Sequence, residues 1–295
     1  MPACVCRCGR PLLPDGWRCV CCQRAYDNGD GVLRWLSEAG QSAVGPFLRQ
    51  YREVRERDGY RVRVPAYYRA LPSVGAHDPQ WAVWQVRRES FVRLRRLLLS
   101  RFPHGAPTVL DLGAGCGWLS NRLAEVGCRP VAVDVLDDEY DGLGACRYYD
   151  QAFSRVHAGF DDLPFAARQF DAVVFNGSLH YAPDVSATLL RAATLLAPGG
   201  VIAVVDSPMF RSPLDGELMC KRTLERFRRD YGLASPALPG EGYVTRVRLD
   251  AVARTLGREP HFFESRGPAR WALGRLIVRW RSRQVAPKFG VWIAT

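Results

Sequence analysis

Two hydrophobic periodicities alternate in the middle of the chain. Residues 108–112 ("TVLDL") and 130–134 ("PVAVD") are short runs of mostly apolar and β-branched residues, which predict buried strands. Apolar residues recur at helical spacing over residues 117–126 between them. A strand, a helix and a second strand in this order predict a β-α-β unit with parallel strands. Upstream, residues 81–99 alternate apolar side chains with arginines in the manner of an amphipathic helix.

The loop after the first strand contains three glycines at every second position. In "DLGAGCGWL", Gly113, Gly115 and Gly117 let the backbone approach a ligand closely, because a Cβ would collide with it or forbid the dihedral angles. A dinucleotide fingerprint requires a glycine where Trp118 stands. Asp111, two residues before the first glycine, would repel a pyrophosphate but suits a ligand with an ammonium group.

This loop resembles the first motif of the class I S-adenosylmethionine-dependent methyltransferases, Asp/Glu-x-Gly-x-Gly-x-Gly. The resemblance continues through Leu163-Pro164-Phe165, through Phe170-Asp171 before "AVVFN", and through "LLAPGGVIAVVD" at 195–206. It implies an α/β fold with a Rossmann-like, doubly wound, seven-stranded sheet, completed by strands at 260–264 and 289–293, the last antiparallel. It also implies that Asp134, with Val135 beside it, accepts hydrogen bonds from the cofactor ribose.

The same resemblance assigns further cofactor contacts. The family often places an acidic residue four before Leu-Pro-Phe, but position 159 is glycine. With a one-residue deletion, Asp161 is the choice for the adenine contact and Phe160 stacks on the ring. The alternative for Asp161 and Asp162 is helix capping or solvent exposure. Asn176 is expected near the methionine end.

The remaining segments are expected to frame an acceptor site. In this family a helical segment, here residues 37–107, often folds over the cofactor. Tyr67, Tyr68, Trp84 and Arg87 are its candidate lining residues, with ordinary packing on the sheet as the alternative. Within a methyltransferase domain over 108–295, residues 207–248 form an acceptor-side insertion, and its Gly- and Pro-rich part, 235–242, predicts a mobile loop.

Six of the ten cysteines lie in the first 22 residues. Two close clusters separated by turn residues suit a tetrahedral Zn²⁺, which would stabilise a piece too small to fold alone. Residues 1–36 resemble the zinc-ribbon leader of some bacterial methyltransferases, although valine stands where the first Cys-x-x-Cys needs a cysteine. Either Cys4 or Cys6 substitutes for it. The predicted structural zinc ligands are Cys6, Cys8, Cys19 and Cys22, and the alternative is a reduced cluster without metal.

The candidate catalytic residues follow the fourth predicted strand. Methyl transfer is an in-line displacement in which the protein mainly positions the acceptor, although an acidic acceptor also needs a base. In "NGSLHYAPD", His180 is the candidate base and Tyr181 orients the acceptor. The alternative for His180 is a structural hydrogen bond, since many relatives work by proximity alone.

Charge and composition leave three functions open. The leading prediction is methyl transfer to a small-molecule acceptor, with specialised metabolism as one setting. Basic flanks, +9 in 1–107 and +9 in 211–295 around −7 in the centre, suggest an RNA base methyltransferase as the alternative. A cofactor-binding scaffold, or an enzyme catalysing a different displacement or cyclisation, is the third. No long apolar run predicts a membrane span or a signal, so a cytoplasmic protein is expected; the oligomeric state is not predicted.

Overall fold

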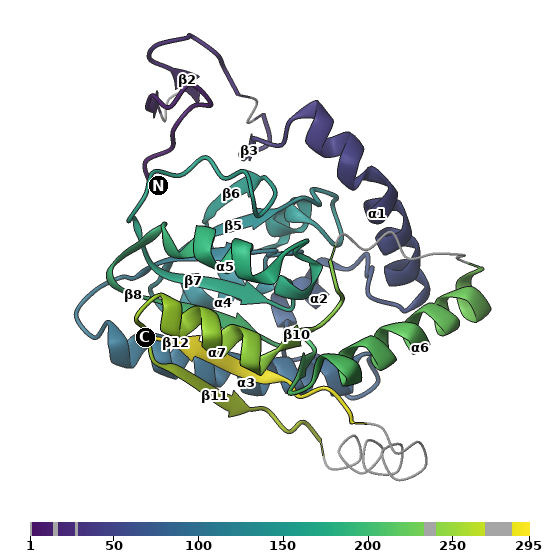
Figure 1. Ribbon diagram of the computed structural model, residues 1–295. Helices are drawn as coiled ribbons and strands as arrows, with labels where there is room; N and C mark the ends of the chain where they lie inside the picture. The colour runs from purple at the N-terminus through teal and green to yellow at the C-terminus, as the bar shows by residue number, and fades with distance from the viewer. Residues whose placement is uncertain (1, 14–16, 27–28, 233–239, 269–284) are drawn as a thin grey trace.

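A computed structural model describes residues 2–13, 17–26, 29–232, 240–268 and 285–295. Its centre is an eight-stranded sheet in the order β11-β12-β8-β7-β4-β5-β6-β3 (Figure 1). The strands are β3 (Val32–Arg34), β4 (Thr108–Leu112), β5 (Arg129–Asp134), β6 (Ser154–His157), β7 (Phe170–Asn176), β8 (Leu196–Val205), β11 (Pro260–Glu264) and β12 (Gly290–Ala294). All neighbours pair in parallel except β12, which is antiparallel to both β8 and β11.

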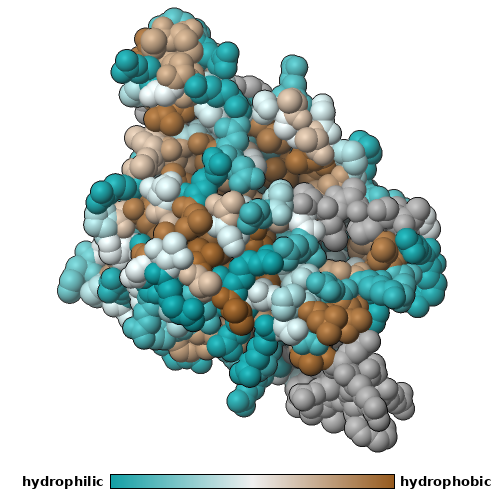
Figure 2. Space-filling model, viewed as in Figure 1, coloured by the Kyte–Doolittle hydropathy of each residue, from teal (hydrophilic) through white to brown (hydrophobic). Residues whose placement is uncertain are grey.

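Helices cover both faces of the sheet. Apolar side chains of α5 (Val185–Ala193) and α7 (Arg246–Thr255) pack on one face. Those of α2 (Pro65–Ala70), α3 (Trp81–Arg101), α4 (Trp118–Glu125) and η1 (Leu143–Tyr148) pack on the other. Figure 2 shows many hydrophilic side chains over the α5 and α7 side, as expected for the outer faces of amphipathic helices. The predicted α/β doubly wound architecture is therefore confirmed.

The predicted β-α-β unit and the antiparallel last strand are present, but the sheet has one strand more than the seven expected. The additional strand, β3, lies at the edge and pairs in parallel with β6. It comes from residues 1–36, which the sequence assigns to the zinc ribbon. Two of its three side chains, Val32 and Leu33, are buried, so the strand covers apolar surface at the edge of the large sheet.

The rest of the N-terminal segment contains the hairpin of β1 (Leu12–Leu13) and β2 (Arg18–Cys19), followed by the long helix α1 (Glu38–Arg57). Figure 1 shows the hairpin at one end of the molecule and α1 beside the carboxyl ends of the central strands. Ser37 caps α1 by accepting a hydrogen bond from the Gly40 N–H at 3.2 Å. The N-terminal segment therefore meets the sheet at two places: β3 pairs with β6 at its edge, and α1 lies beside the carboxyl ends of its central strands.

Residues 207–248 contain the small parallel pair β9 (Met209–Phe210) and β10 (Val244–Thr245), and the helix α6 (Pro213–Tyr231). The predicted mobile loop at 235–242 lies largely outside the described residues. Gly240 and Gly242 are described. The Gly242 N–H donates to the His180 carbonyl at 3.0 Å, which fixes the end of the insertion against η2 (Leu179–Tyr181). None of the described helices is long and apolar enough to cross a membrane.

Candidate active site

A cavity of about 270 Å³ lies where four neighbouring strands end. The residues that follow β4, β5, β6 and β7 all contribute to its wall, and α1 and α3 cover it from the other side. This is the position at which open α/β sheets bind ligands, because helix and loop backbones diverge there and leave a crevice. The three-dimensional arrangement thus brings the glycine loop together with residues distant in sequence.

The three glycines of the loop differ in what an added Cβ would contact. All have positive φ, between +54° and +75°. A Cβ on Gly113 would lie 2.3 Å from Ser178 Cβ, and one on Gly117 would lie 2.5 Å from Cys146 Sγ. A Cβ on Gly115 would meet only the Asp141 carbonyl, at an ordinary 3.6 Å. Gly113 and Gly115 line the cavity, whereas Gly117 starts α4 and faces protein.

Asp134 lies at the end of β5 and lines the cavity together with Val135. Its Oδ2 accepts the Gly115 N–H and its Oδ1 the Leu136 N–H, both at 2.7 Å. A carboxylate offers about four acceptor positions, and the Val135 N–H also acts on this carboxylate, so at least one position remains for a ligand. Burial raises the pKa of Asp134 to about 6, against the opposing effect of these backbone donors.

Asp111 lies behind the glycine loop rather than in the cavity wall. It is fully buried, and its Oδ2 accepts the Ser120 hydroxyl at 2.8 Å, while its Oδ1 has no hydrogen-bond partner among the residues that the structure describes. Burial raises its pKa to about 7. This placement ties the loop to α4, and the predicted direct contact of Asp111 with a ligand ammonium group remains a prediction.

The loop after β6 forms one end of the cavity. Phe160, Asp161 and Asp162 all line it, and the Phe160 ring packs edge-on against Phe175 with centroids 5.7 Å apart. Asp161 is exposed, with a long 3.9 Å ion pair to Arg191. Asp162 accepts the Trp35 indole N–H at 2.9 Å and pairs with Arg7 at 2.7 Å. Asp162 therefore has structural partners, whereas Asp161 has a carboxylate available to a ligand.

Of the three candidates after β7, Asn176 and Tyr181 line the cavity and His180 does not. His180 Nδ1 lies 3.3 Å from Ser207 Oγ, and its ring packs on Tyr181 at 4.1 Å. Burial, with the nearby Arg87 cation, lowers the pKa of His180 to about 3. Its role as a base stays a prediction; the Ser207 contact matches the alternative of a structural hydrogen bond.

The side of the cavity opposite the loops is built by helices. Trp84 and Arg87 of α3 line it as predicted, but Tyr67 and Tyr68 do not. The Tyr68 hydroxyl donates to the Val62 carbonyl at 2.6 Å. The Tyr67 hydroxyl accepts the Trp84 indole N–H at 3.1 Å. These two tyrosines support the wall from behind.

The sequence reasoning missed the contribution of α1. This helix supplies five lining residues: Val44, Phe47, Leu48, Tyr51 and Arg55. The first four follow the i, i+3, i+4, i+7 spacing of one helix face, so the periodicity of the segment could have revealed them. The described part of the 207–248 insertion, expected to shape the acceptor pocket, contributes no lining residue.

The two cavity arginines differ in their partners. Arg55 makes a bidentate pair with Asp141, at 2.7 and 2.6 Å. Arg87 lies over the Trp84 ring, 4.7 Å from its centroid. Within the described ranges, its guanidinium has no hydrogen-bond or ion-pair partner. Its charge acts on the buried Asp206, whose pKa burial raises and Arg87 lowers. Among the described residues Arg87 is thus a cavity-lining cation without a hydrogen-bonded counter-ion, which favours an anionic group in a ligand.

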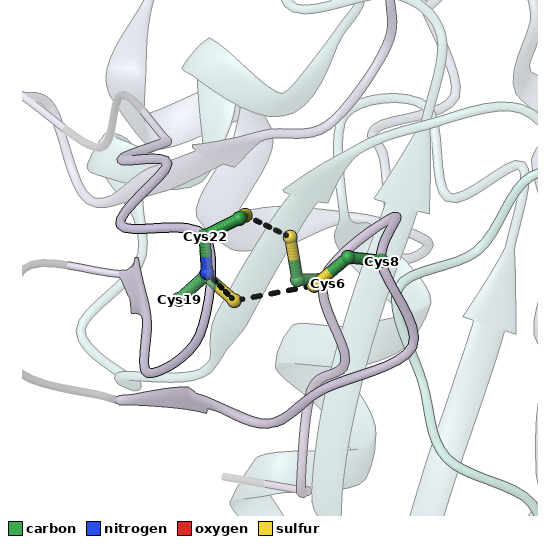
Figure 3. Close-up of side chains that lie close together, drawn as sticks. All are labelled: Cys6, Cys8, Cys19 and Cys22. Carbon is green, nitrogen blue, oxygen red and sulfur yellow. Dashed lines mark hydrogen bonds between the residues drawn. The ribbon is translucent and has the colours of Figure 1, made fainter.

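A second candidate site lies in the N-terminal hairpin segment, by which we mean β1, β2 and the residues on either side of them from Cys4 to Tyr26. There the structure brings the four predicted cysteines together (Figure 3). Their sulfur atoms all lie within 4.8 Å of one another, with Cys6–Cys22 at 3.6 Å and Cys8–Cys19 at 3.4 Å. Four thiolates about 2.3 Å from a Zn²⁺ lie roughly 3.8 Å apart in a tetrahedron. The donor set and its spacing therefore fit zinc.

The two spare cysteines lie outside this cluster. Cys4 is buried and forms an isolated β-bridge with Phe165, and burial raises the pKa of its thiol to about 12. Cys21 is exposed and is not among the four. The backbone N–H groups of Cys21 and Cys22 lie 3.3 and 3.4 Å from Cys19 Sγ. Such donors stabilise negative charge on a sulfur ligand.

Comparisons with known proteins agree with the fold. Residues 110–204 match the family model of a methyltransferase domain. The chain is 35% identical over 120 residues to an uncharacterized methyltransferase of Mycobacterium tuberculosis (strain ATCC 25618 / H37Rv), a match that covers 40% of this chain and 60% of that relative. It is 33% identical over 124 residues to a ubiquinone biosynthesis O-methyltransferase of Xanthomonas axonopodis pv. citri, covering 41% and 51%.

Among solved structures, the magnesium protoporphyrin IX methyltransferase of Synechocystis PCC 6803, with bound S-adenosylhomocysteine, superimposes with a TM-score of 0.51. The identity is 15%, and the alignment covers 82% of this chain and 98% of that one. The fold is therefore the Rossmann-like fold of the class I methyltransferases. The matches to the two sequence relatives span only 60% and 51% of the relatives' length. They therefore indicate a shared domain and do not establish the activity of the whole protein.

Proposed function

We propose that the chain transfers a methyl group from S-adenosylmethionine to a small-molecule acceptor. The observation that carries this proposal is the contact between Gly115 and Asp134 in the cavity wall, 2.7 Å from N to Oδ2. It places a carboxylate with a free acceptor position beside a loop residue without a side chain. That pair suits a ribose diol held close to backbone.

The rest of the cofactor follows from this anchor, in the order of the strand ends. Phe160 and Asp161, after β6, receive the adenine, the ring by stacking and its amino group by hydrogen bonding. Asn176 and Arg87 lie toward β7, at the opposite end, where the methionine part belongs. The unpaired Arg87 guanidinium suits the carboxylate of that part. When bound, the cofactor supplies a methyl group activated by its sulfonium.

Two parts of the cavity can now be distinguished. The cofactor half consists of Gly113–Gly115, Asp134, Val135 and Phe160–Asp162. The acceptor half consists of Val44, Phe47, Leu48, Tyr51, Tyr181 and Pro183. The rings of Phe47 and Tyr51 lie 5.4 and 6.2 Å from that of Tyr181, so three aromatic side chains enclose this half. An enclosed aromatic wall favours a flat, largely apolar acceptor.

The chemistry required of the chain is positioning. The aromatic wall holds the acceptor in line with the methyl group, and the Tyr181 hydroxyl donates a hydrogen bond to the acceptor oxygen, which favours its ionised, phenolate form. The phenolic proton passes to solvent before transfer, and the oxygen then takes the methyl group while S-adenosylhomocysteine is released. Burial raises the pKa of Tyr181, so this hydroxyl is a donor at neutral pH rather than a base. The relative whose name places it in ubiquinone biosynthesis supports a phenolic acceptor class.

A panel of phenols, hydroxyquinones, fatty acids and total RNA, incubated with radiolabelled S-adenosylmethionine, tests the proposal. We expect S-adenosylhomocysteine to form with a phenolic or quinol member, and Asp134→Ala to abolish it. Label found only in the RNA would instead support the RNA alternative. Cofactor binding without turnover on any member would favour a scaffold or a different reaction.

The N-terminal cluster is proposed to hold one structural Zn²⁺ on Cys6, Cys8, Cys19 and Cys22. The hairpin has a very small core of its own, so metal ligation would stabilise it. Elemental analysis of purified protein should give one equivalent of zinc. Cys22→Ser should lose it, and Cys21→Ser, at the neighbouring exposed position, should keep it. Protein purified without metal, yet equally folded in this segment, would contradict the assignment.

A further inference from the structure

The zinc-ribbon hairpin is joined to the adenine end of the cavity by a continuous set of contacts. Arg7 lies in the chain between the ligands Cys6 and Cys8. Its Nη2 lies 2.7 Å from Asp162 Oδ2 and donates to the Trp35 carbonyl at 2.8 Å, and its guanidinium lies over the Trp35 ring at 4.7 Å. Asp162 lines the cavity. One side chain therefore connects the cysteine cluster to the cavity wall.

Trp35 and Tyr26 complete this connection. The Trp35 indole N–H donates to Asp162 Oδ1 at 2.9 Å, so both carboxylate oxygens of Asp162 are held from the N-terminal segment. The Tyr26 ring stacks on Trp35 with centroids 4.8 Å apart, and its hydroxyl lies 3.3 Å from Cys6 Sγ. The path from a zinc ligand to the loop thus runs through aromatic stacking as well as an ion pair.

The backbone supports the same loop from a second direction. The Val5 N–H donates to the Pro164 carbonyl at 2.7 Å, and the Ala166 N–H donates to the Ala3 carbonyl at 3.2 Å. On the other side, the Trp35 and Leu36 N–H groups both donate to the His157 carbonyl. The loop 159–162, which contains Phe160 and Asp161, therefore lies between two stretches of chain that are each bonded to the N-terminal segment.

We infer that the metal-bound hairpin positions the adenine-binding loop, with Arg7 and Trp35 as positioning residues, so that loss of the metal weakens cofactor binding at a distance. This inference rests on the proposed function. Phe160 and Asp161 immediately precede Asp162, so any shift of Asp162 moves them. When the cluster is intact, the backbone of Arg7 is fixed by ligands on both sides. Without metal, that constraint is lost and the loop gains freedom that a ligand must then restrict.

The contact is partly solvent-exposed, with 32% of the Arg7 side chain and 46% of the Asp162 side chain accessible. Exposed ion pairs contribute little by themselves. The indole hydrogen bond and the stacked rings make the connection stronger than a single pair, but the effect on affinity remains moderate. We expect about a threefold to tenfold change in dissociation constant, which a calorimetric titration resolves.

The test compares binding of 5′-methylthioadenosine and S-adenosylhomocysteine to the full chain and its variants. Arg7→Gln and Asp162→Asn should each weaken both ligands about threefold to tenfold. The double variant should be no weaker than the worse single variant, because the two residues act as a unit. Arg10→Gln, at an exposed arginine of the same hairpin, is the matched control and should bind as wild type.

Metal removal supplies the second arm. Chelation of wild-type protein should weaken 5′-methylthioadenosine at least as much as Arg7→Gln does, and should have little further effect on Arg7→Gln. Hydrogen exchange over residues 159–166 should rise in both cases, with zinc content unchanged in Arg7→Gln. Wild-type protein that binds neither ligand would refute the proposed function. Wild type that binds both, with the variants and the metal-free protein within twofold, would overturn the inference.

Discussion

The two halves of the cavity come from different kinds of structural element: loops that follow strands form one, and a helix distant in the chain forms most of the other. The cofactor half comes from the loops that follow β4, β5 and β6, each a few residues long and fixed by the strand before it. The acceptor half comes mainly from α1, about 60 residues upstream of the glycine loop, together with Tyr181 and Pro183 after β7. The first depends on local backbone geometry, and the second on how a helix docks. Substitutions should therefore affect the halves in different ways.

The largest effect is expected in the glycine loop. Gly115→Ala places a methyl group in the cofactor half at a cost of about 1–2 kcal/mol in folding free energy for the left-handed backbone. We expect S-adenosylhomocysteine binding to weaken more than about a hundredfold, since the ligand can no longer approach the backbone of the loop closely. Calorimetric titration and urea unfolding measure the two quantities.

Two matched glycines separate backbone strain from the loss of the cavity. Gly127→Ala has the same sign of φ, +85°, and open space around its Cβ, so it should lose similar stability and keep full binding. Gly113→Ala would drive its Cβ into Ser178 and should destabilise the fold by about 3 kcal/mol or more, as overpacking with backbone strain does. Normal binding by Gly115→Ala would contradict the assigned cofactor half.

The next effect concerns the junction of the halves, at Arg87. Arg87→Gln should weaken S-adenosylhomocysteine by about 10- to 30-fold, which corresponds to roughly 1.5–2 kcal/mol, the lower part of the range for a charge-assisted hydrogen bond to a carboxylate. It should leave 5′-methylthioadenosine, which lacks that carboxylate, within twofold. Equal loss for both ligands would mean that Arg87 supports the wall through Trp84 instead.

Substitutions in the acceptor half should change the affinity for the cofactor less than those above and should act on the acceptor instead. Phe47→Ala should raise the KM of the acceptor found in the panel about tenfold and leave the affinity for S-adenosylhomocysteine within twofold. His180→Ala should change kcat less than about threefold, since this side chain faces Ser207 and not the cavity. A fall of kcat by a hundredfold or more would restore His180 as the catalytic base.

The smallest effect is the pH dependence of cofactor binding. Burial raises the pKa of Asp134 to about 6. Nearly all Asp134 carboxyl groups are therefore ionised well above pH 6, and this ionised form, which would accept the ribose hydroxyls, is lost as the pH falls through that value. S-adenosylhomocysteine should bind about three- to fivefold more weakly at pH 5.5 than at pH 7.5. Asp134→Asn should bind weakly and without this dependence. Asp111→Asn separates the contribution of Asp111, whose pKa of about 7 lies nearby.

The sequence predicts the cofactor half well because its information is local. A strand, a glycine loop and an acidic residue at the next strand end are contiguous patterns. Asp134, Val135 and Phe160 lie in the cavity wall, and their contact with the cofactor stays a prediction. The sequence also predicts the four cysteines whose sulfur atoms lie within 4.8 Å of one another, and their binding of zinc stays a prediction. In each case a few neighbouring residues determine the geometry.

The parts that sequence reasoning could not place depend on tertiary docking. Nothing within residues 32–34 indicates that this strand joins the edge of the main sheet beside β6. Likewise, Asp111 and His180 lie close in sequence to the loops that line the cavity, but neither side chain lines it. The Asp111 side chain contacts Ser120 behind the glycine loop, and the His180 side chain contacts Ser207. The direction of a side chain in a loop is fixed by packing partners that are distant in the chain.

The proposed function depends on the binding of S-adenosylmethionine by the glycine loop and Asp134. The decisive experiment is a calorimetric titration of the wild type and of Asp134→Ala with S-adenosylmethionine and S-adenosylhomocysteine. We expect micromolar binding of both ligands to the wild type and a loss of at least about tenfold in the variant. Absence of binding to folded wild type, or equal affinity of the two proteins, would contradict it.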